Sequence, residues 1–177
     1  MLVCLLGGAL APPSARATVL VPADLNELAA SALAIVHARI VEVKAVTTAD
    51  RQRVETVVVA QSLDYLKGNL GPTIVFRVPG GQVGAYRTVM IGAPSFAAGE
   101  EAVLFFGARG PSLPYLVGFS QGVFRVEVDA RTGARLVTPA PAISTGERVK
   151  LTRGTRPPVP LETFAAQVRA LVSGGKR

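Results

Sequence analysis

Four short stretches of this 177-residue chain carry side chains that could do chemistry. Gly80, Gly81 and Gly84 resemble part of a phosphate-binding loop, and Ser120 in "GFSQG" matches the outline Gly-x-Ser-x-Gly of a nucleophile elbow. His37 is the only histidine, and Glu100-Glu101 is a pair of adjacent carboxylates. Each chemistry requires particular secondary structure around these residues.

The three glycines predict a bend between strands. A dinucleotide loop needs Gly-x-Gly-x-x-Gly followed by a helix, because the helix N-terminus binds the pyrophosphate. Here the order is Gly-Gly-x-x-Gly, and the next residues, "AYRTVMI", are β-branched and aromatic. We therefore expect no nucleotide site, and glycines that adopt positive φ in a wide turn.

The other stretches predict no catalytic set, no metal site and no cofactor. A strand is expected after Ser120 and no histidine lies downstream, so the elbow match is accidental. A single histidine excludes most zinc centres, and His37 is interpreted as a satisfied surface or rim residue, with general base chemistry left open. Glu100 and Glu101 would point to opposite faces of a strand; both are expected to be solvated at a turn, and the alternative is that one faces an Arg or Lys on a neighbouring strand.

The apolar pattern predicts strands flanked by two helices. Residues 22–31 have helical spacing, and 33–46 read as a long strand whose polar residues change parity, which predicts a bulge near Ile40 and Val41. Further strands are expected at 54–66, 73–78, 86–91 and 101–106, and residues 130–137 read as a hairpin turn and a return strand. Residues 115–129 should form two short strands around Gln121-Gly122. Ile74, Phe76 and Val78 of the third strand should share one face, and Phe124, Val126 and Val128 of the later strand should point inward.

The end of the chain is basic and helical. Residues 131–177 hold nine Lys or Arg against two Asp or Glu, whereas residues 18–130 hold nine against ten. Residues 139–160 are rich in Pro, Gly and basic residues and predict extended chain. From Leu161 to Gly174 apolar residues recur at helical spacing, which predicts an amphipathic helix that docks on the sheet.

The first 17 residues predict export. The apolar run Leu2–Ala11 precedes Ala15-Arg16-Ala17, the small-x-small pattern of signal peptidase sites. Cys4, the only cysteine, lies inside this segment, so the mature chain would hold no disulfide. We expect a secreted or periplasmic protein without a transmembrane segment. Its partner would be another exported protein or an anionic surface, and not a nucleic acid.

Several short motifs resemble, in order, a group of uncharacterised secreted bacterial proteins. They are "ASALAIVHARIVEV", "VVVAQSLDYLKG", "IVFRVPGG", "GAPSFAAGEEAVLFF" and "VGFSQGVFRV". More distantly, Lys67-Gly68 and "EEAVLFFG" resemble netrin-like modules, which include the tissue inhibitors of metalloproteinases. That resemblance implies an OB-type barrel with flanking helices. Those inhibitors chelate the protease zinc through an N-terminal cysteine, which the mature chain would lack.

Together these patterns predict a mainly β chain built as a small OB-like, netrin-like barrel. The expected divisions are a signal peptide (1–17), a barrel domain with an N-terminal helix (18–138), a basic extended segment (139–160) and a C-terminal helix (161–174). The expected function is a non-enzymatic binding module. The alternatives are an inhibitor or chaperone of an exported metalloprotease, and an enzyme that uses His37 beside a carboxylate. The candidate binding residues are Gly80, Gly81, Gly84, Tyr86, Arg87, Arg148, Lys150, Arg153 and Arg156.

Overall fold

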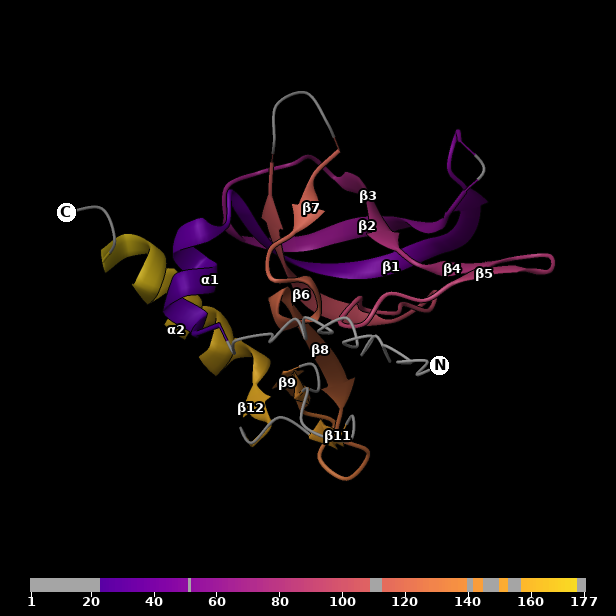
Figure 1. Cartoon of the computed structure of the whole chain (residues 1–177). Helices are drawn as coiled ribbons and strands as arrows, with labels where there is room; N and C mark the ends of the chain where they lie inside the picture. The colour runs from indigo at the N-terminus through magenta and orange to yellow at the C-terminus, as the bar shows by residue number, and fades with distance from the viewer. Residues whose placement is uncertain are drawn as a thin grey trace, which may run out of the picture.

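A computed structural model describes residues 23–50, 52–108, 113–139, 142–144, 150–152 and 157–174 (Figure 1). The predicted signal peptide lies outside this part of the chain. The helices are α1 (Leu25–Ser31), α2 (Leu161–Gly174) and the 3-10 turn η1 (Phe119–Gly122). The strands are β1 (Ala34–Thr47), β2 (Val54–Lys67), β3 (Thr73–Pro79), β4 (Gly81–Val83), β5 (Tyr86–Thr88), β6 (Glu101–Gly107), β7 (Tyr115–Leu116), β8 (Val123–Val128), β9 (Arg135–Pro139), β10 (Ala142–Ser144), β11 (Lys150–Thr152) and β12 (Val159–Pro160).

The main sheet is antiparallel and contains eight strands. Its order is β12-β9-β8-β6-β1-β2-β3, and β7 also pairs with β6. Two further ribbons, β4-β5 and β10-β11, are separate two-stranded sheets. Figure 1 shows α1 and α2 together on one side of the molecule, while the β4-β5 hairpin projects on the opposite side. No helix in the described ranges is long and apolar enough to cross a membrane.

The long first strand is bent, as its polar pattern predicts. The register between β1 and β2 shifts between Ile40 and Glu42, which leaves Val41 without a partner and 54% exposed. This is the expected bulge. Two more shifts occur along the same pair, one beginning at Ile35 and one at His37.

The sheet separates two hydrophobic clusters. On one face, α1 and α2 pack on Ile35, Val103, Phe105 and Phe124. On the other face, the remaining buried hydrophobic side chains of β1 and β6 pack against β2 and β3. Both central strands are therefore covered on two sides, which explains the unbroken apolar run of β6.

The sheet curls until its distant strands touch. The rings of Phe76 on β3 and Phe106 on β6 have centroids 5.1 Å apart, although these strands are not neighbours in the pairing order. The pairings among the described strands nevertheless form an open path that ends at β12 and β3. The mainly β prediction with two flanking helices is confirmed, whereas closure into a barrel is not.

Two predictions about strand ends are wrong. The strand expected at 86–91 ends at Thr88, because its partner β4 has only three residues, and Val89, Met90 and Ile91 continue as exposed chain. Val128 is 64% exposed because the pairing of β8 with the buried strand β6 ends at Val126. Ile74, Phe76 and Val78 share one face as predicted, and that face is the buried one; Phe124 is buried as predicted, and Val126 is partly buried.

The C-terminal helix forms and docks as predicted. Leu161, Phe164, Ala165 and Val168 are buried on its inner face, and the rings of Phe164 and Phe124 are 4.9 Å apart. The expected 22–31 helix is also present, shortened to α1. Asp24 is the N-cap residue of this helix and forms a capping box with Glu27.

Candidate functional site

The glycine bend positions the β4-β5 hairpin against β2. Gly80 and Gly81 have φ of 102° and 138°, and Gly84 at the turn has φ of 57°, so the prediction of positive φ is confirmed. Gly80 donates its N–H to the Val54 carbonyl, and the Thr56 hydroxyl donates to the Gly80 carbonyl at 2.7 Å. A Cβ on Gly81 would lie 2.8 Å from the Thr56 hydroxyl oxygen, so the close approach itself requires glycine.

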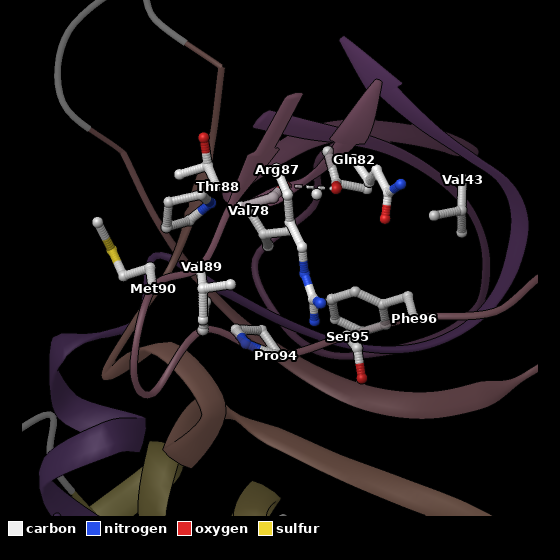
Figure 2. Close-up of a pocket in the computed structure, with 15 residues that line it drawn as sticks. Val43, Val78, Gln82, Arg87, Thr88, Val89, Met90, Pro94, Ser95 and Phe96 are labelled. Atoms are coloured by element: carbon white, nitrogen blue, oxygen red, sulfur yellow. Dashed lines mark hydrogen bonds between the residues drawn. The ribbon is translucent and has the colours of Figure 1, made fainter. Parts of the chain in front are cut away.

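One side of this bend forms the wall of a cavity of about 490 Å³ (Figure 2). Gly80, Gly81 and Arg87 line it from the hairpin, and Pro94, Ser95 and Phe96 line it from the loop before β6. Figure 2 shows the Arg87 side chain extending across the cavity toward Phe96. The loop expected as a bend is thus also a cavity wall. The chain after it enters β5 and not a helix, as the argument against a nucleotide site requires.

A second cavity of about 520 Å³ adjoins the first, because Val78 and Pro79 line both. It lies between β3 and the β7-η1 segment. A hydrogen bond of 3.2 Å from the Ser120 N–H to the Gly92 carbonyl joins η1 to the chain after β5. We call these two adjoining cavities the apolar groove.

Exposed apolar side chains surround the apolar groove. They come from the chain after β5 and from the β7-η1 segment, and their exposed fractions are Val89 72%, Met90 44%, Ile91 67%, Leu113 46%, Tyr115 37% and Phe119 45%. Scattered exposed apolar residues are ordinary, whereas a gathering of them beside cavities is typical of an interaction surface.

Phe119 is held in this exposed position by a strained backbone. Its φ is 54°, and it is the non-glycine residue with positive φ in the described part of the chain. The left-handed conformation costs an L-residue about 1–2 kcal/mol. Strain of this kind gathers at binding and catalytic sites. The fold therefore keeps an aromatic ring in water at a cost in stability.

The structure brings some of the predicted binding residues together. Gly80, Gly81 and Arg87 line the apolar groove, whereas Gly84 and Tyr86, which is 73% exposed, lie toward the tip of the hairpin. Lys150 begins β11. Arg148, Arg153 and Arg156 lie outside the described residues.

A second candidate site centres on His37, on the sheet face that the helices cover. His37 is only 6% exposed, and its Nε2 lies 3.1 Å from a carboxylate oxygen of Glu101. The other oxygen of Glu101 accepts hydrogen bonds from Nε and Nη2 of Arg39, at 3.2 and 2.7 Å. The His37 side chain has a hydrogen-bond partner, as predicted, but it is buried and does not lie at the surface. The expectation that Glu101 is solvated is wrong.

The Glu101 carboxylate is held in its ionised form. Burial, the largest single influence, acts to raise its pKa, but the hydrogen bonds from Arg39, the charge of Arg135 and the interaction with His37 together lower the pKa below 4.5. A carboxylate only accepts hydrogen bonds, so Nε2 of a neutral His37 carries the proton and Nδ1 is the free acceptor.

His37 opens onto a cavity of about 300 Å³, which we call the polar cavity. Four elements supply its walls, namely β1, β2, β9 and the first turns of α2. The lining residues are His37, Arg39, Leu63, Asp64, Leu66, Arg135, Leu161, Glu162 and Ala165. The condition set for the enzyme alternative, His37 in a pocket beside a carboxylate, is therefore met. No serine, threonine or cysteine is among the lining residues of the polar cavity in the described part of the chain.

The remaining sequence candidates form no site. Ser120 lies in η1 and β8 follows it, as expected for an accidental match. Glu100 pairs with Arg125 at 2.6 Å and Glu101 with Arg39, so the two carboxylates do point apart. The described residues include no group of three His, Cys, Asp or Glu side chains that could hold a metal ion.

Sequence reasoning missed both the His37–Glu101 pair and the strained Phe119. The pair depends on the register of β1 against β6, which places Arg39 opposite Glu101 and which no local pattern specifies. For Phe119 the one available signal is Gly118 before it, a glycine with φ of 65°.

No protein-family model, curated protein or solved structure gives a match to this chain. The resemblance to secreted bacterial proteins and to netrin-like modules stays a prediction.

Proposed function

We propose that this protein is an exported, non-enzymatic binding module that holds an apolar segment of another exported protein in the apolar groove. The supporting observation is the gathering of six exposed apolar side chains around two adjoining cavities. One of them, Phe119, is exposed at the expense of backbone strain. In the same proposal the curled sheet is an OB-type, netrin-like barrel with an open seam between β3 and β7, where one of the cavities lies.

The groove favours an extended apolar segment over a small molecule. Its two parts meet at the end of β3, at Arg77, Val78 and Pro79, and the described residues place no strand in hydrogen-bonded pairing with the outer edge of β3. An extended segment can hydrogen-bond to such an edge while its side chains enter the adjoining cavities. Tyr115 and Phe119 are aromatic residues of the kind that dominate the energetics of protein interfaces.

Site-specific photo-crosslinking in the exporting cell tests this proposal. A photo-reactive residue replaces Ile91, which is 67% exposed and follows Met90, a lining residue of the groove, or Val128, which is 64% exposed at the end of β8 and serves as the matched control. We expect a discrete protein adduct from position 91 and none from position 128. Equal labelling at both positions, or no adduct at position 91, would count against the groove as the binding surface.

The protease alternative has a separate test. If the protein inhibits or chaperones an exported metalloprotease, an excess of purified protein changes the activity of the secreted metalloproteases. Unchanged activity removes this alternative and leaves the binding-module proposal in place.

A further inference from the structure

We infer that the guanidinium of Arg87 selects the segment that the apolar groove holds, and that this segment carries an acidic side chain among its apolar residues. The inference rests on the proposed function, because it names the chemistry of the partner at the same groove. An arginine stays protonated in proteins, so the positive charge at this place does not depend on a titration.

The first observation is the position of Arg87. It lies in β5, opposite Gln82 of β4, and lines the first cavity of the groove. Figure 2 shows its side chain extending across that cavity toward the ring of Phe96. Phe96 packs edge-to-face on the buried ring of Phe76, with centroids 5.5 Å apart. A group that binds to Arg87 therefore also meets an apolar wall that is fixed to the core.

The second observation is that the charge of Arg87 is not balanced by its surroundings. Its side chain forms no hydrogen bond or ion pair within the described residues. Glu55 on β2 is paired with Arg77 at 3.1 Å. Glu100, in the loop before β6, is paired with Arg125 at 2.6 Å. These carboxylates are therefore occupied by other arginines.

The third observation is the absence of negative charge from the groove walls. Among the described residues no carboxylate lines either cavity, and the charged lining residues are Arg87 and Arg77. Because Arg77 is balanced by Glu55, Arg87 remains as the unbalanced charge. A wholly apolar segment would cover this guanidinium and take it out of water without a partner, which is unfavourable. A carboxylate at the same place can accept two parallel hydrogen bonds from the guanidinium.

The carboxylate is expected on a side chain within the segment. When an extended segment pairs with a strand edge, its backbone bonds to the edge and its side chains enter the adjoining cavities. Alternate side chains of such a segment point to the same face. The two cavities meet at Val78 and Pro79, so the segment continues from one into the other. The expected pattern is one Asp or Glu at Arg87 with an apolar residue two positions away.

A peptide library tests this inference with the full chain. Random heptapeptides are displayed in a loop of a carrier protein and are joined to it at both ends, so that no peptide has a free carboxyl terminus. Selected peptides are then synthesised with blocked ends, and each is paired with an analogue that has Asn or Gln in place of the acid. Titration calorimetry measures both peptides against the unchanged protein, Arg87→Gln and Arg131→Gln. Arg131 is the matched control, an exposed arginine in the turn before β9 that does not line either cavity.

We expect the selected peptides to combine apolar residues with one Asp or Glu. Arg87→Gln should weaken the acidic peptide by about three- to tenfold, the effect of losing a charge-assisted hydrogen bond at a partly exposed site. The amide analogue should bind Arg87→Gln as tightly as it binds the unchanged protein, and Arg131→Gln should behave as the unchanged protein. Because Arg87 has no described side-chain partner, Arg87→Gln should unfold at the same urea concentration as the unchanged protein.

Two results would overturn the inference and leave the proposed function in place. They are the selection of apolar peptides without an acidic residue, and an acidic peptide that binds Arg87→Gln as tightly as the unchanged protein. A library that yields no apolar peptide would overturn the proposed function and this inference together.

Discussion

The substitution Gly81→Ala tests how the glycine bend positions the apolar groove. A side chain at this position has to adopt φ of 138°, which costs an L-residue about 1–3 kcal/mol. Its Cβ would also lie 2.8 Å from the Thr56 hydroxyl oxygen and 3.2 Å from a methyl group of Val54. Overpacking of this kind adds about 1–3 kcal/mol. Together these effects predict a loss of about 2–6 kcal/mol in the free energy of unfolding.

The matched control is Gly84→Ala in the same hairpin. Gly84 also has a positive φ, of 57°, but a Cβ there would have nothing within 4 Å. The expected loss is the left-handed penalty alone, about 1–2 kcal/mol. Urea unfolding followed by circular dichroism measures both values. If Gly81→Ala is no less stable than Gly84→Ala, the close approach to β2 does not hold the hairpin, and the account of the bend is wrong.

Three further perturbations address other parts of the molecule. Because the pKa of Glu101 is lowered in the folded state, its ionised carboxylate stabilises the fold at pH values above the ordinary pKa of a glutamate, and this stability is lost as the pH falls through the lowered pKa. Glu101→Gln should therefore reduce the fall in unfolding free energy at acid pH. An unchanged fall would contradict the pairing. Phe164→Ala should lower the free energy of unfolding by about 3–5 kcal/mol, because Phe164 is buried against Phe124. The control Gln167→Ala, on the exposed side of α2, should change it little. Equal effects would mean that α2 is not docked on the sheet. Lys67→Met should lower the free energy of unfolding by about 1.5–3 kcal/mol in thermal or urea unfolding, because the Lys67 ammonium donates a hydrogen bond to the Ala29 carbonyl at 2.7 Å near the end of α1. An unchanged free energy of unfolding would show that this hydrogen bond contributes nothing to stability.

Local patterns predict most of the elements. The change of parity from His37 and Arg39 to Glu42 and Lys44 predicts the bulge at Val41, because one extra residue in a period-2 strand moves the side chains that follow to the opposite face. The same reasoning places the buried side of β3 and the inner face of α2. These features depend on residues close together in the chain, so spacing alone is enough to find them.

The limits of sequence reasoning lie where distant strands meet. The residues Val89, Met90 and Ile91 read as strand core because they are apolar, yet their partner strand ends too early to cover them. His37 and Glu101 are 64 positions apart in the chain, and their pairing depends on a register fixed by side-chain packing. Both candidate sites form where strands that are distant in the sequence come together. The glycines that first suggest a ligand-binding loop instead form part of one wall of the apolar groove.

The measurement that tests the central claim most directly uses Phe119→Gly and the protein captured by crosslinking at position 91. Glycine relieves the strain of φ 54° by about 1–2 kcal/mol and adds about 0.5–1 kcal/mol of chain entropy to the unfolded state, so the fold should be at least as stable as before. The loss of the exposed ring should weaken binding to the partner at least tenfold in titration calorimetry. An affinity equal to that of the unchanged protein, in a variant that folds, would contradict the assignment of the apolar groove as the binding surface.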